Sequence, residues 1–156
     1  MRNFSDEYWM QLALVEAQKA FEEDEVPVGA VVVYNNKIIG QGHNQTEKLR
    51  DPTAHAEIIA LSAASNYLNN WRLTEALVYV TLEPCVMCTG ALILARIKKL
   101  VFAAFDPKFG ACGSVYNVPL DNKLNHKFQV KSGVLADESR RLLTQFFKKH
   151  RKKVLH

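Results

Sequence analysis

Val28-Gly29-Ala30-Val31-Val32-Val33-Tyr34 is a run rich in β-branched residues, and Asn35-Asn36 separates it from a second short run, Lys37-Ile38-Ile39-Gly40. β-Branched side chains favour strands because they pack well on a pleated surface. Asparagine tolerates the positive φ angles that a two-residue hairpin turn requires. The stretch therefore predicts two antiparallel strands joined by a tight turn at the start of a sheet.

The segments around this hairpin show the spacing of helices and strands in turn. Before it, apolar residues recur at helical steps after Ser5, a possible N-cap: Met10, Leu14, Ala17 and Phe21. After it, His43 to Thr53 is polar, which predicts a loop that ends with Thr53 as the cap of a helix. The expected helices are 6–24, 53–64, 85–95 and 137–149, and the expected further strands are 77–80, 100–104 and 129–134.

This alternation after an opening hairpin is typical of an α/β fold. We expect a three-layer α/β/α sandwich around a mixed five-stranded sheet, antiparallel at the hairpin edge and parallel elsewhere. No internal repeat, linker or low-complexity segment divides the sequence. Residues 1–156 are therefore expected to form a single domain.

The composition is that of an ordinary folded protein. Of the 156 residues, 48% are hydrophobic and 23% are charged, which excludes disordered and collagen-like classes. No stretch approaches the roughly 18 to 20 consecutive apolar residues of a membrane-spanning helix. Met1 to Glu7 has neither the apolar core nor the cleavage site of a secretory signal. We therefore expect a cytoplasmic location and no membrane partner.

Basic residues gather at the C-terminal end of the sequence. From Arg140 to His156 there are seven lysines and arginines and no acidic residue, although the net charge of the whole chain is only +4. Such a run can be the solvated end of a helix, where cations also interact favourably with the helix dipole. It can equally contact a polyanion such as RNA. Both interpretations of this basic helix, 137–156, stay open.

Two short motifs carry residues that bind metals. Pro84-Cys85-Val86-Met87-Cys88 places two thiols where a predicted strand gives way to a helix, and His55-Ala56-Glu57 opens the preceding helix. Helix N-termini favour thiolate over thiol, and the thiolate is the form that binds metals. Two sulfurs and one imidazole are one ligand short of a closed structural zinc site. We therefore expect one zinc ion on His55, Cys85 and Cys88, with water as the fourth ligand.

Several alternatives to this interpretation stay open. A Cys-x-x-Cys pair is also typical of redox proteins. His43, His126 and Cys112 are further candidates for the fourth ligand, although a buried thiol is more often inert. Glu57 follows His55 by two residues, so the two cannot both bind a metal from a helix flank. At the helix tip, Glu57 can act as a base beside the zinc-bound water, or it can simply stabilise the start of the helix.

These motifs resemble those of a known enzyme family. His-x-Glu followed by Pro-Cys-x-x-Cys is the signature of the zinc-dependent nucleobase deaminases. Longer stretches resemble the bacterial tRNA-specific adenosine deaminases, of the cytidine and deoxycytidylate deaminase superfamily: Glu25 to Val31, Asp51 to Glu57 and Leu77 to Cys88. The similarity continues to Phe146-Phe147 and covers nearly the whole chain. It implies a cytidine-deaminase-like fold, one zinc ion per chain and a homodimer.

The resemblance also implies a reaction and roles for single residues. The reaction is the hydrolytic deamination of the wobble adenosine to inosine in a tRNA anticodon loop, that of an arginine tRNA. The implied zinc ligands are His55, Cys85 and Cys88, with Glu57 as the proton shuttle. Six residues are expected at the substrate: Val28 and Asn44 at the target base, and Asp106, Lys108, Phe147 and Arg151 at the flanking nucleotides.

Two other functions fit part of the same pattern. Deaminases of a free nucleobase or nucleoside, of the guanine or cytosine type, share the zinc motif. The choice of a tRNA substrate therefore depends on Asn44, Asp106 and the basic tail. An RNA-binding module with a structural zinc ion would not be an enzyme at all. Measuring the release of ammonia from RNA and from free nucleosides would distinguish these three functions.

Overall fold

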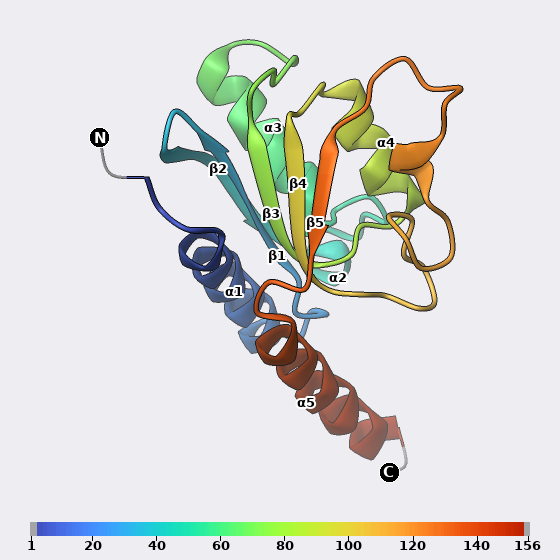
Figure 1. Ribbon diagram of the computed structural model, residues 1–156. Helices are drawn as coiled ribbons and strands as arrows, with labels where there is room; N and C mark the ends of the chain where they lie inside the picture. The colour runs from blue at the N-terminus through green and yellow to red at the C-terminus, as the bar shows by residue number, and fades with distance from the viewer. Residues whose placement is uncertain (1–2, 155–156) are drawn as a thin grey trace.

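The opening hairpin is present as the sequence predicts. The computed structural model describes residues 3–154, and in it β1 (Gly29–Tyr34) pairs antiparallel with β2 (Lys37–His43). Asn35 and Asn36 form the turn, with φ angles of 50° and 60°. Figure 1 shows this hairpin at one side of the sheet.

Three more strands complete a mixed five-stranded sheet. β3 (Leu77–Leu82), β4 (Lys99–Ala104) and β5 (Gln129–Ser132) extend it in the order β2-β1-β3-β4-β5. The pairs β3–β4 and β4–β5 are parallel. The expectation that only the hairpin is antiparallel is wrong, because β1 also pairs antiparallel with β3. A helix carries the chain from β2 across to β3, so these two strands run parallel and β1 lies between them.

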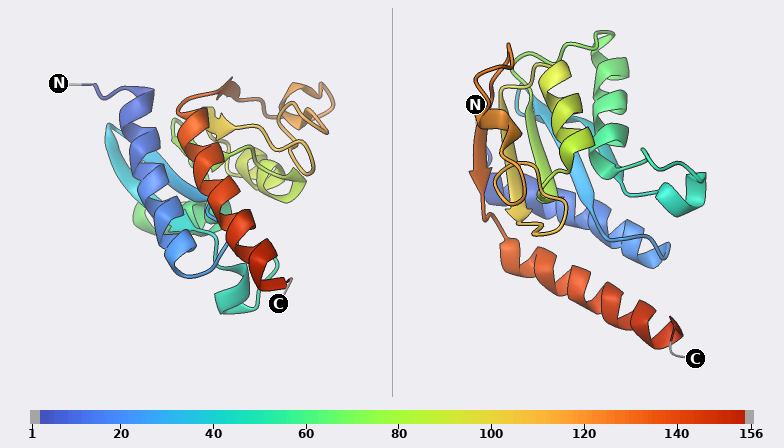
Figure 2. Two further views of the ribbon diagram at one scale, coloured as in Figure 1. Left: turned by 90° about the horizontal axis from the view of Figure 1, so that it is seen from below. Right: turned by 90° about the vertical axis from the view of Figure 1, so that its right-hand side faces the viewer.

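Helices cover both faces of the sheet, as the predicted three-layer sandwich requires. α1 (Asp6–Glu22) and α5 (Ala136–Val154) lie on one face, and α3 (Ala56–Leu68) and α4 (Val86–Leu94) lie on the other (Figures 1 and 2). Side chains alternate accordingly along β1. Ala30 and Val32 join the core beneath α3 and α4, whereas Val31 and Val33 join the core beneath α1. Each fully buried valine contributes about 1.5–3 kcal/mol to this packing.

Two glycines of the hairpin let the helices approach the sheet closely. A Cβ at Gly29 would overlap the carbonyl oxygen of Ala13 in α1, and a Cβ at Gly40 would overlap that of Ala60 in α3. Both positions therefore require glycine because a helix lies so close to the strand, and not because the backbone has a positive φ. The close packing of α3 on the hairpin fixes the N-terminal end of α3 relative to the sheet.

The segment 43–55 differs from its prediction. A four-residue helix, α2 (Thr46–Leu49), interrupts the expected loop. Thr53 does not cap the next helix, because its backbone N–H and its hydroxyl both donate to Asp51 Oδ1, at 2.8 and 2.7 Å. His55 is the N-cap residue of α3 instead. The side chain of Asp51 thus holds Thr53 in a turn that precedes the helix.

The first and last predicted helices are present, with bounds that differ from the expected ones. Ser5 caps α1, since its hydroxyl oxygen accepts the backbone N–H of Tyr8 at 3.1 Å. α5 begins at Ala136 and continues to Val154, beyond the 137–149 suggested by the apolar pattern. The last two positions of the proposed basic helix 137–156 lie outside the described residues. Within residues 3–154, no helix is both long and apolar enough to cross a membrane.

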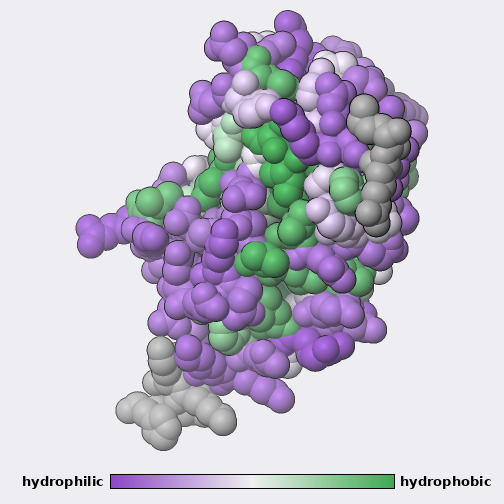
Figure 3. All heavy atoms as spheres, turned by 90° about the vertical axis from the view of Figure 1, so that its left-hand side faces the viewer, coloured by the Kyte–Doolittle hydropathy of each residue, from purple (hydrophilic) through white to green (hydrophobic). Residues whose placement is uncertain are grey.

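Strand β2 forms one edge of the sheet, and Lys37 and Gln41 on it are exposed. Figure 3 shows this side of the molecule, where hydrophobic side chains form a strip bordered by hydrophilic ones. Polar side chains on an edge strand discourage pairing with a second sheet.

Candidate active site

The two predicted metal-binding motifs meet at the N-terminal ends of two neighbouring helices. His55 is the N-cap residue of α3 and Cys85 that of α4, and both have extended backbone dihedrals. Because α3 and α4 pack against each other on one face of the sheet, the two N-termini are close. His55 Nδ1 lies 3.6 Å from Cys85 Sγ and 3.5 Å from Cys88 Sγ. The structure thus brings together the three predicted ligands.

The spacing of these atoms suits a tetrahedral zinc ion. Zinc binds imidazole nitrogen at about 2.0–2.1 Å and thiolate sulfur at about 2.3 Å, so tetrahedral angles place a nitrogen and a sulfur about 3.6 Å apart. The nitrogen–sulfur distances of 3.5 and 3.6 Å match that separation. The three ligand atoms also lie within 4.8 Å of one another. His55, Cys85 and Cys88 can therefore hold such an ion with little movement.

The other candidates for a fourth ligand interact elsewhere. His43 Nε2 lies 2.9 Å from a carboxylate oxygen of Glu23. His126 Nε2 lies 2.8 Å from a backbone carbonyl oxygen. Cys112 is buried, with its sulfur 3.3 Å from the hydroxyl oxygen of Thr89. Among the described residues, three side chains are thus placed to bind one metal ion, which is the number of protein ligands in open zinc sites.

The three ligand side chains change one another's protonation. The Cys88 thiol donates a hydrogen bond to Cys85, and this bond, together with the neighbouring His55, lowers the pKa of Cys85 to about 4. The same hydrogen bond, together with burial, raises the pKa of Cys88. The hydrogen bond between His55 and Cys85 raises the pKa of the imidazole. A metal cation can replace the protons of such a cluster, since its ligands bind in the deprotonated form.

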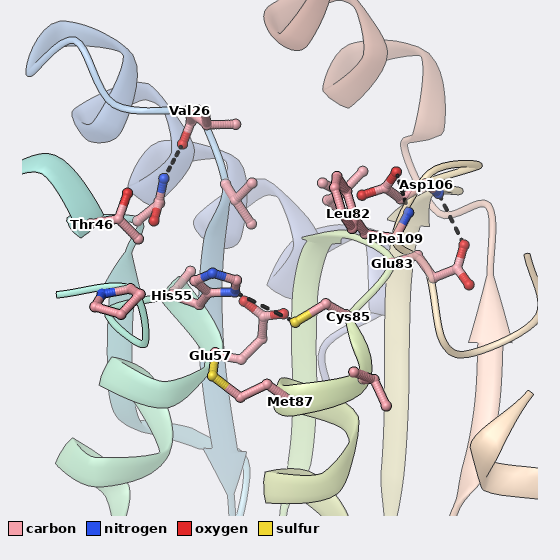
Figure 4. Close-up of a pocket in the computed structure, with 15 residues that line it drawn as sticks. Val26, Thr46, His55, Glu57, Leu82, Glu83, Cys85, Met87, Asp106 and Phe109 are labelled. Atoms are coloured by element: carbon pink, nitrogen blue, oxygen red, sulfur yellow. Dashed lines mark hydrogen bonds between the residues drawn. The ribbon is translucent and has the colours of Figure 1, made fainter. Parts of the chain in front are cut away.

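Glu57 lies beside these ligands in the first turn of α3. Its side chain is buried, with 4% of the residue exposed, and this burial raises the pKa of the carboxyl group to about 7. Figure 4 shows His55, Glu57 and Cys85 pointing toward one another. A carboxyl group in this position can take a proton from one atom of a bound molecule and return it to another.

A pocket of about 530 Å³ opens beside these side chains, which is within the usual range for small-molecule sites. Its lining includes three of the residues predicted to contact substrate, Val28, Asn44 and Asp106. In Figure 4, Thr46 lies on one side of the pocket, and Asp106 and Phe109 lie on the opposite side. The pocket therefore has one wall from the segment after β2 and another from the segment after β4.

Asn44 has the most informative hydrogen bonding in the pocket. Its amide Nδ2 donates to the backbone carbonyl of Val26 at 3.4 Å, which fixes the orientation of the amide group. Its Oδ1 is buried and has no hydrogen-bond partner among the described residues. Leaving such an acceptor unpaired costs about 1–3 kcal/mol. A ligand that donates a hydrogen bond to Asn44 would remove this cost.

The remaining predicted substrate residues do not line this pocket in the described part of the chain. Lys108 is exposed on the loop after β4, where its backbone N–H donates to Asp106 Oδ1 at 3.1 Å. Phe147 lines an adjoining cavity between α5 and the segment before β1, which shares Val26 and Thr46 with the first pocket. Arg151 is exposed near the end of α5. These three residues surround the pocket at a distance and do not form it.

Sequence reasoning missed Glu83, which holds the loop after β4. Only 2% of this residue is exposed. Its carboxylate accepts backbone N–H groups from Asp106 at 2.9 Å, Cys112 at 2.9 Å and Ser114 at 3.0 Å, and it also accepts the Ser114 hydroxyl. The available signal was a charged residue directly before Pro84 at the end of an apolar strand.

Glu25 was missed in the same way, and it holds the opposite wall. This residue is 1% exposed, and its carboxylate accepts the backbone N–H groups of Glu47 at 3.0 Å and Lys48 at 2.8 Å. These bonds explain why the short helix α2 forms in a segment for which the sequence predicts a loop. Thr46, at the start of α2, lines the pocket. Two buried carboxylates thus position the two walls of the pocket.

The sequence and fold match those of known deaminases. The family model described as MafB19-like deaminase matches residues 4–151. A tRNA-specific adenosine deaminase of Bacillus subtilis is 47% identical over 148 residues, which are 95% of this chain and 92% of the relative. A tRNA-specific adenosine deaminase of Aquifex aeolicus is 46% identical over 149 residues, 96% of this chain and 98% of the relative. The chain belongs to the family of the tRNA-specific adenosine deaminases.

Solved structures agree with this assignment. A structure from studies of A-to-I editing by tRNA:A34 deaminases at the wobble position of transfer RNA superimposes with a TM-score of 0.85 and 45% identity, over 87% of this chain and 99% of the other. A guanine deaminase of Nitrosomonas europaea superimposes with a TM-score of 0.80 and 28% identity, over 93% of this chain and 86% of the other. The cytidine-deaminase-like fold predicted from the sequence is confirmed.

Proposed function

We propose that this protein converts adenosine to inosine by hydrolysis at the wobble position of a tRNA anticodon. The observation that carries the proposal is the meeting of His55, Cys85 and Cys88 with the buried carboxyl group of Glu57 beside one pocket. The relatives named as tRNA-specific adenosine deaminases, at up to 47% identity, support the choice of tRNA and of adenosine.

The chain's own residues account for the steps of this reaction. His55, Cys85 and Cys88 hold the zinc ion, one per chain, which supplies Lewis acidity that makes water a nucleophile at neutral pH. Glu57 takes a proton from the attacking water and passes it to N1 of adenine. It then takes the proton of the new C6 hydroxyl group and transfers it to the departing amino group. Water adds at C6, the C6–N bond breaks, and the products are a C6 carbonyl and ammonia.

The other side chains of the pocket bind and orient the base. Asn44 offers its unpaired Oδ1 to the substrate from a fixed amide, and Val28 supplies an apolar wall. A stacked base would shield C6, so the adenosine must be turned out of its loop before it enters. A pyrimidine ring is smaller, so with its reacting carbon at the metal site it would be placed differently against Asn44 Oδ1, which disfavours cytidine at the same position.

Residues around the pocket are proposed to bind the flanking anticodon nucleotides. Asp106 and Lys108 lie on the loop after β4, and Phe147 and Arg151 lie on α5. The basic end of α5 suits the phosphates of RNA. The resemblance noted in the sequence favours an arginine tRNA as the substrate. Such a substrate also favours the cytoplasm as the place of action.

A homodimer is proposed from the resemblance, and one surface supports it. Exposed apolar side chains lie on α4 and on the segment 115–124 that follows the pocket loop, with exposed fractions of 46% to 70%: Leu94, Val115, Tyr116 and Leu120. α4 contacts Val118–Leu120 within this segment, so Leu94 and Leu120 lie on neighbouring elements. Apolar patches of this kind mark interaction sites. We also propose that residues 1–156 act as one domain.

Deamination of matched RNA hairpins tests the proposed function. Two anticodon stem-loops that differ only in adenosine or cytidine at the wobble position are incubated with zinc-loaded protein, and ammonia release is measured beside free guanine, cytosine and adenosine. We expect conversion of the adenosine hairpin and much slower reaction of free adenosine, because flanking nucleotides help to hold C6 in place. Conversion of the cytidine hairpin to the same extent would contradict the proposed role of Asn44.

The same experiment tests the alternative, a deaminase of free guanine. The superposition on a guanine deaminase with a TM-score of 0.80 favours this candidate. Rapid ammonia release from guanine, with the hairpins left intact, would replace the proposed function by this alternative. Release from neither substrate would favour an RNA-binding module with a structural metal.

A further inference from the structure

Phe109 lines the pocket although most of it is exposed to solvent. Its exposed fraction is 70%, whereas Phe102 and Phe146 are 0% and 5% exposed. A buried phenylalanine stabilises the core through the hydrophobic effect, and a side chain that stays in water does not. Aromatic side chains, phenylalanine among them, are enriched on the surfaces with which proteins bind partners.

The loop that carries Phe109 is held in place by hydrogen bonds. Asp106 Oδ1 accepts the backbone N–H groups of Lys108 at 3.1 Å and Phe109 at 3.3 Å. The backbone N–H of Gly110 donates to the carbonyl oxygen of Asp106 at 2.9 Å. A Cβ at Gly110 would overlap the buried carboxylate of Glu83, which is the anchor of the loop. The backbone of Phe109 therefore has one defined position, so binding at the ring need not order the loop that carries it.

The neighbours of the ring narrow the choice of what it binds. Phe109 lines the same pocket as His55 and Glu57, on the side opposite Thr46 (Figure 4). When a target base occupies this pocket, the nucleotide next to it in the RNA chain must pass over the rim. A second protein chain that covered Phe109 would also cover part of the opening through which RNA enters. A nucleobase next to the target fits both the position and the flat apolar surface of the ring.

We propose that Phe109 is a stacking platform for the unpaired nucleobase adjacent to the target adenosine. This inference rests on the proposed function and adds a substrate-binding residue to it. Stacking tolerates any base, because every base presents a π face. Phe109 thus contributes affinity for an unpaired, splayed loop rather than for one particular sequence.

Kinetics of Phe109 variants on the wobble-adenosine stem-loop test the proposal. Stacking of one base changes binding by about 5- to 150-fold, so Phe109→Ala is expected to raise KM by about tenfold with kcat little changed. Phe109→Tyr and Phe109→Trp keep an aromatic face and should retain a KM close to that of the unmodified protein. Phe109→Leu keeps an apolar side chain without a π face and should resemble Phe109→Ala.

A matched control separates stacking from a general effect of removing aromatic residues. Tyr67, on α3, is 55% exposed and carries the ammonium group of Lys37 over its ring at 5.1 Å. It lies near the C-terminal end of α3, whereas His55 caps the N-terminal end. Tyr67→Ala should leave both KM and kcat unchanged.

An abasic substitution in the RNA identifies the stacked base. The hairpin is made with an abasic nucleotide on either side of the wobble adenosine. At one of the two positions the substitution should raise the KM of the unmodified protein about tenfold, and on that hairpin Phe109→Ala should cause no further rise. Additive effects of the two changes at both positions would contradict direct stacking.

Other outcomes overturn the inference in recognisable ways. An unchanged KM for Phe109→Ala, or full recovery with Phe109→Leu, would show that no base stacks on the ring. A changed oligomeric state of Phe109→Ala in light scattering would assign the ring to contact with a second copy. If the unmodified protein leaves the wobble adenosine intact, the proposed function is wrong and the stacking role falls with it. If the unmodified protein converts the hairpin and Phe109→Ala does so equally well, only the stacking role is wrong.

Discussion

Glu57 and Glu83 are both almost completely buried, at 4% and 2% exposure, and both line the pocket. Their carboxylates have different surroundings. The carboxylate of Glu83 accepts three backbone N–H groups and the Ser114 hydroxyl. Glu57 lies among His55, Cys85 and Cys88, and burial raises the pKa of its carboxyl group. The carboxylate of Glu83 is thus hydrogen-bonded to donors of the protein itself, whereas the carboxyl group of Glu57 faces the proposed metal centre.

The comparison distinguishes two roles of a buried carboxylate, anchoring a loop and transferring a proton. Hydrogen bonds to an ionised carboxylate stabilise the charge and fix whatever carries the donors. Glu83 therefore positions the loop that bears Asp106 and Phe109. A buried carboxyl group beside metal ligands is instead available for proton transfer. A substitution that removes the charge should therefore lower mainly the turnover at Glu57 and mainly the stability at Glu83.

Glu57→Gln gives the largest expected effect. The amide keeps the shape of the side chain but cannot carry the proton, so deamination should fall by about 10²- to 10⁴-fold. The zinc content and the melting temperature should stay close to those of the unmodified protein, because the metal ligands are intact. Metal analysis and calorimetry provide these controls. A variant that keeps normal turnover would reduce Glu57 to a residue that stabilises the start of α3.

Glu83→Gln should act mainly on stability and on the loop. Oε1 accepts from Asp106 N–H and the Ser114 hydroxyl, and Oε2 accepts from the N–H groups of Cys112 and Ser114. In either orientation of the glutamine amide, its NH₂ group would face donors. The expected cost is about 1–3 kcal/mol, which corresponds to a fall of about 2–12 °C in melting temperature for a protein of this size. KM should rise more than kcat falls, and an unchanged melting temperature would contradict the anchoring role.

Asn44→Ala extends the comparison to a polar atom without a partner. The substitution removes the unpaired Oδ1, which favours the folded state, and the long hydrogen bond from Nδ2 to Val26, which disfavours it, so the stability should change little. Turnover of the wobble adenosine should fall by about 5- to 150-fold, which corresponds to about 1–3 kcal/mol. A large loss of turnover with little change in stability is expected of a residue whose main role is to bind the substrate. Loss of zinc from this variant would indicate a structural role instead.

Truncation after Lys149 should have the smallest effect. It removes Arg151, Lys152 and Lys153, which can act only through phosphates, so binding of RNA should weaken by a few-fold at moderate salt. Each lost phosphate contact should reduce the slope of log affinity against log salt by about 0.7. Lys37→Ala, at the exposed hairpin, removes one charge elsewhere and is the matched control. An unchanged slope would identify the tail as a solvated helix end.

The parts of the site that the sequence predicts are those built by local pattern. The spacing of Cys85 and Cys88, and the placement of His55 and Cys85 at predicted helix starts, located each motif from its own segment, whereas the meeting of the two motifs depends on the packing of α3 against α4. The hairpin followed equally from Val28 to Gly40. In each case a short stretch determines its own conformation.

The parts that the sequence did not predict depend on distant partners. Glu25 stabilises α2 through a hydrogen bond with Glu47, which is 22 residues later in the sequence. Glu83 holds Ser114 across 31 residues. Neither interaction leaves a periodic signal, because a single buried carboxylate resembles any surface glutamate in a sequence. Thr53 was misassigned as a cap because Asp51, two residues earlier, accepts both its N–H and its hydroxyl.

The most direct test of the central claim is to locate inosine in tRNA. Total tRNA lacking inosine is treated with zinc-loaded protein and sequenced, since inosine is read as guanosine. We predict that adenosine at the wobble position of one tRNA, an arginine tRNA, is read as guanosine after treatment with the unmodified protein and stays adenosine after treatment with Glu57→Gln. Unchanged wobble adenosines in every tRNA, or equal conversion by Glu57→Gln, would contradict the claim that Glu57 and the metal centre act on this base.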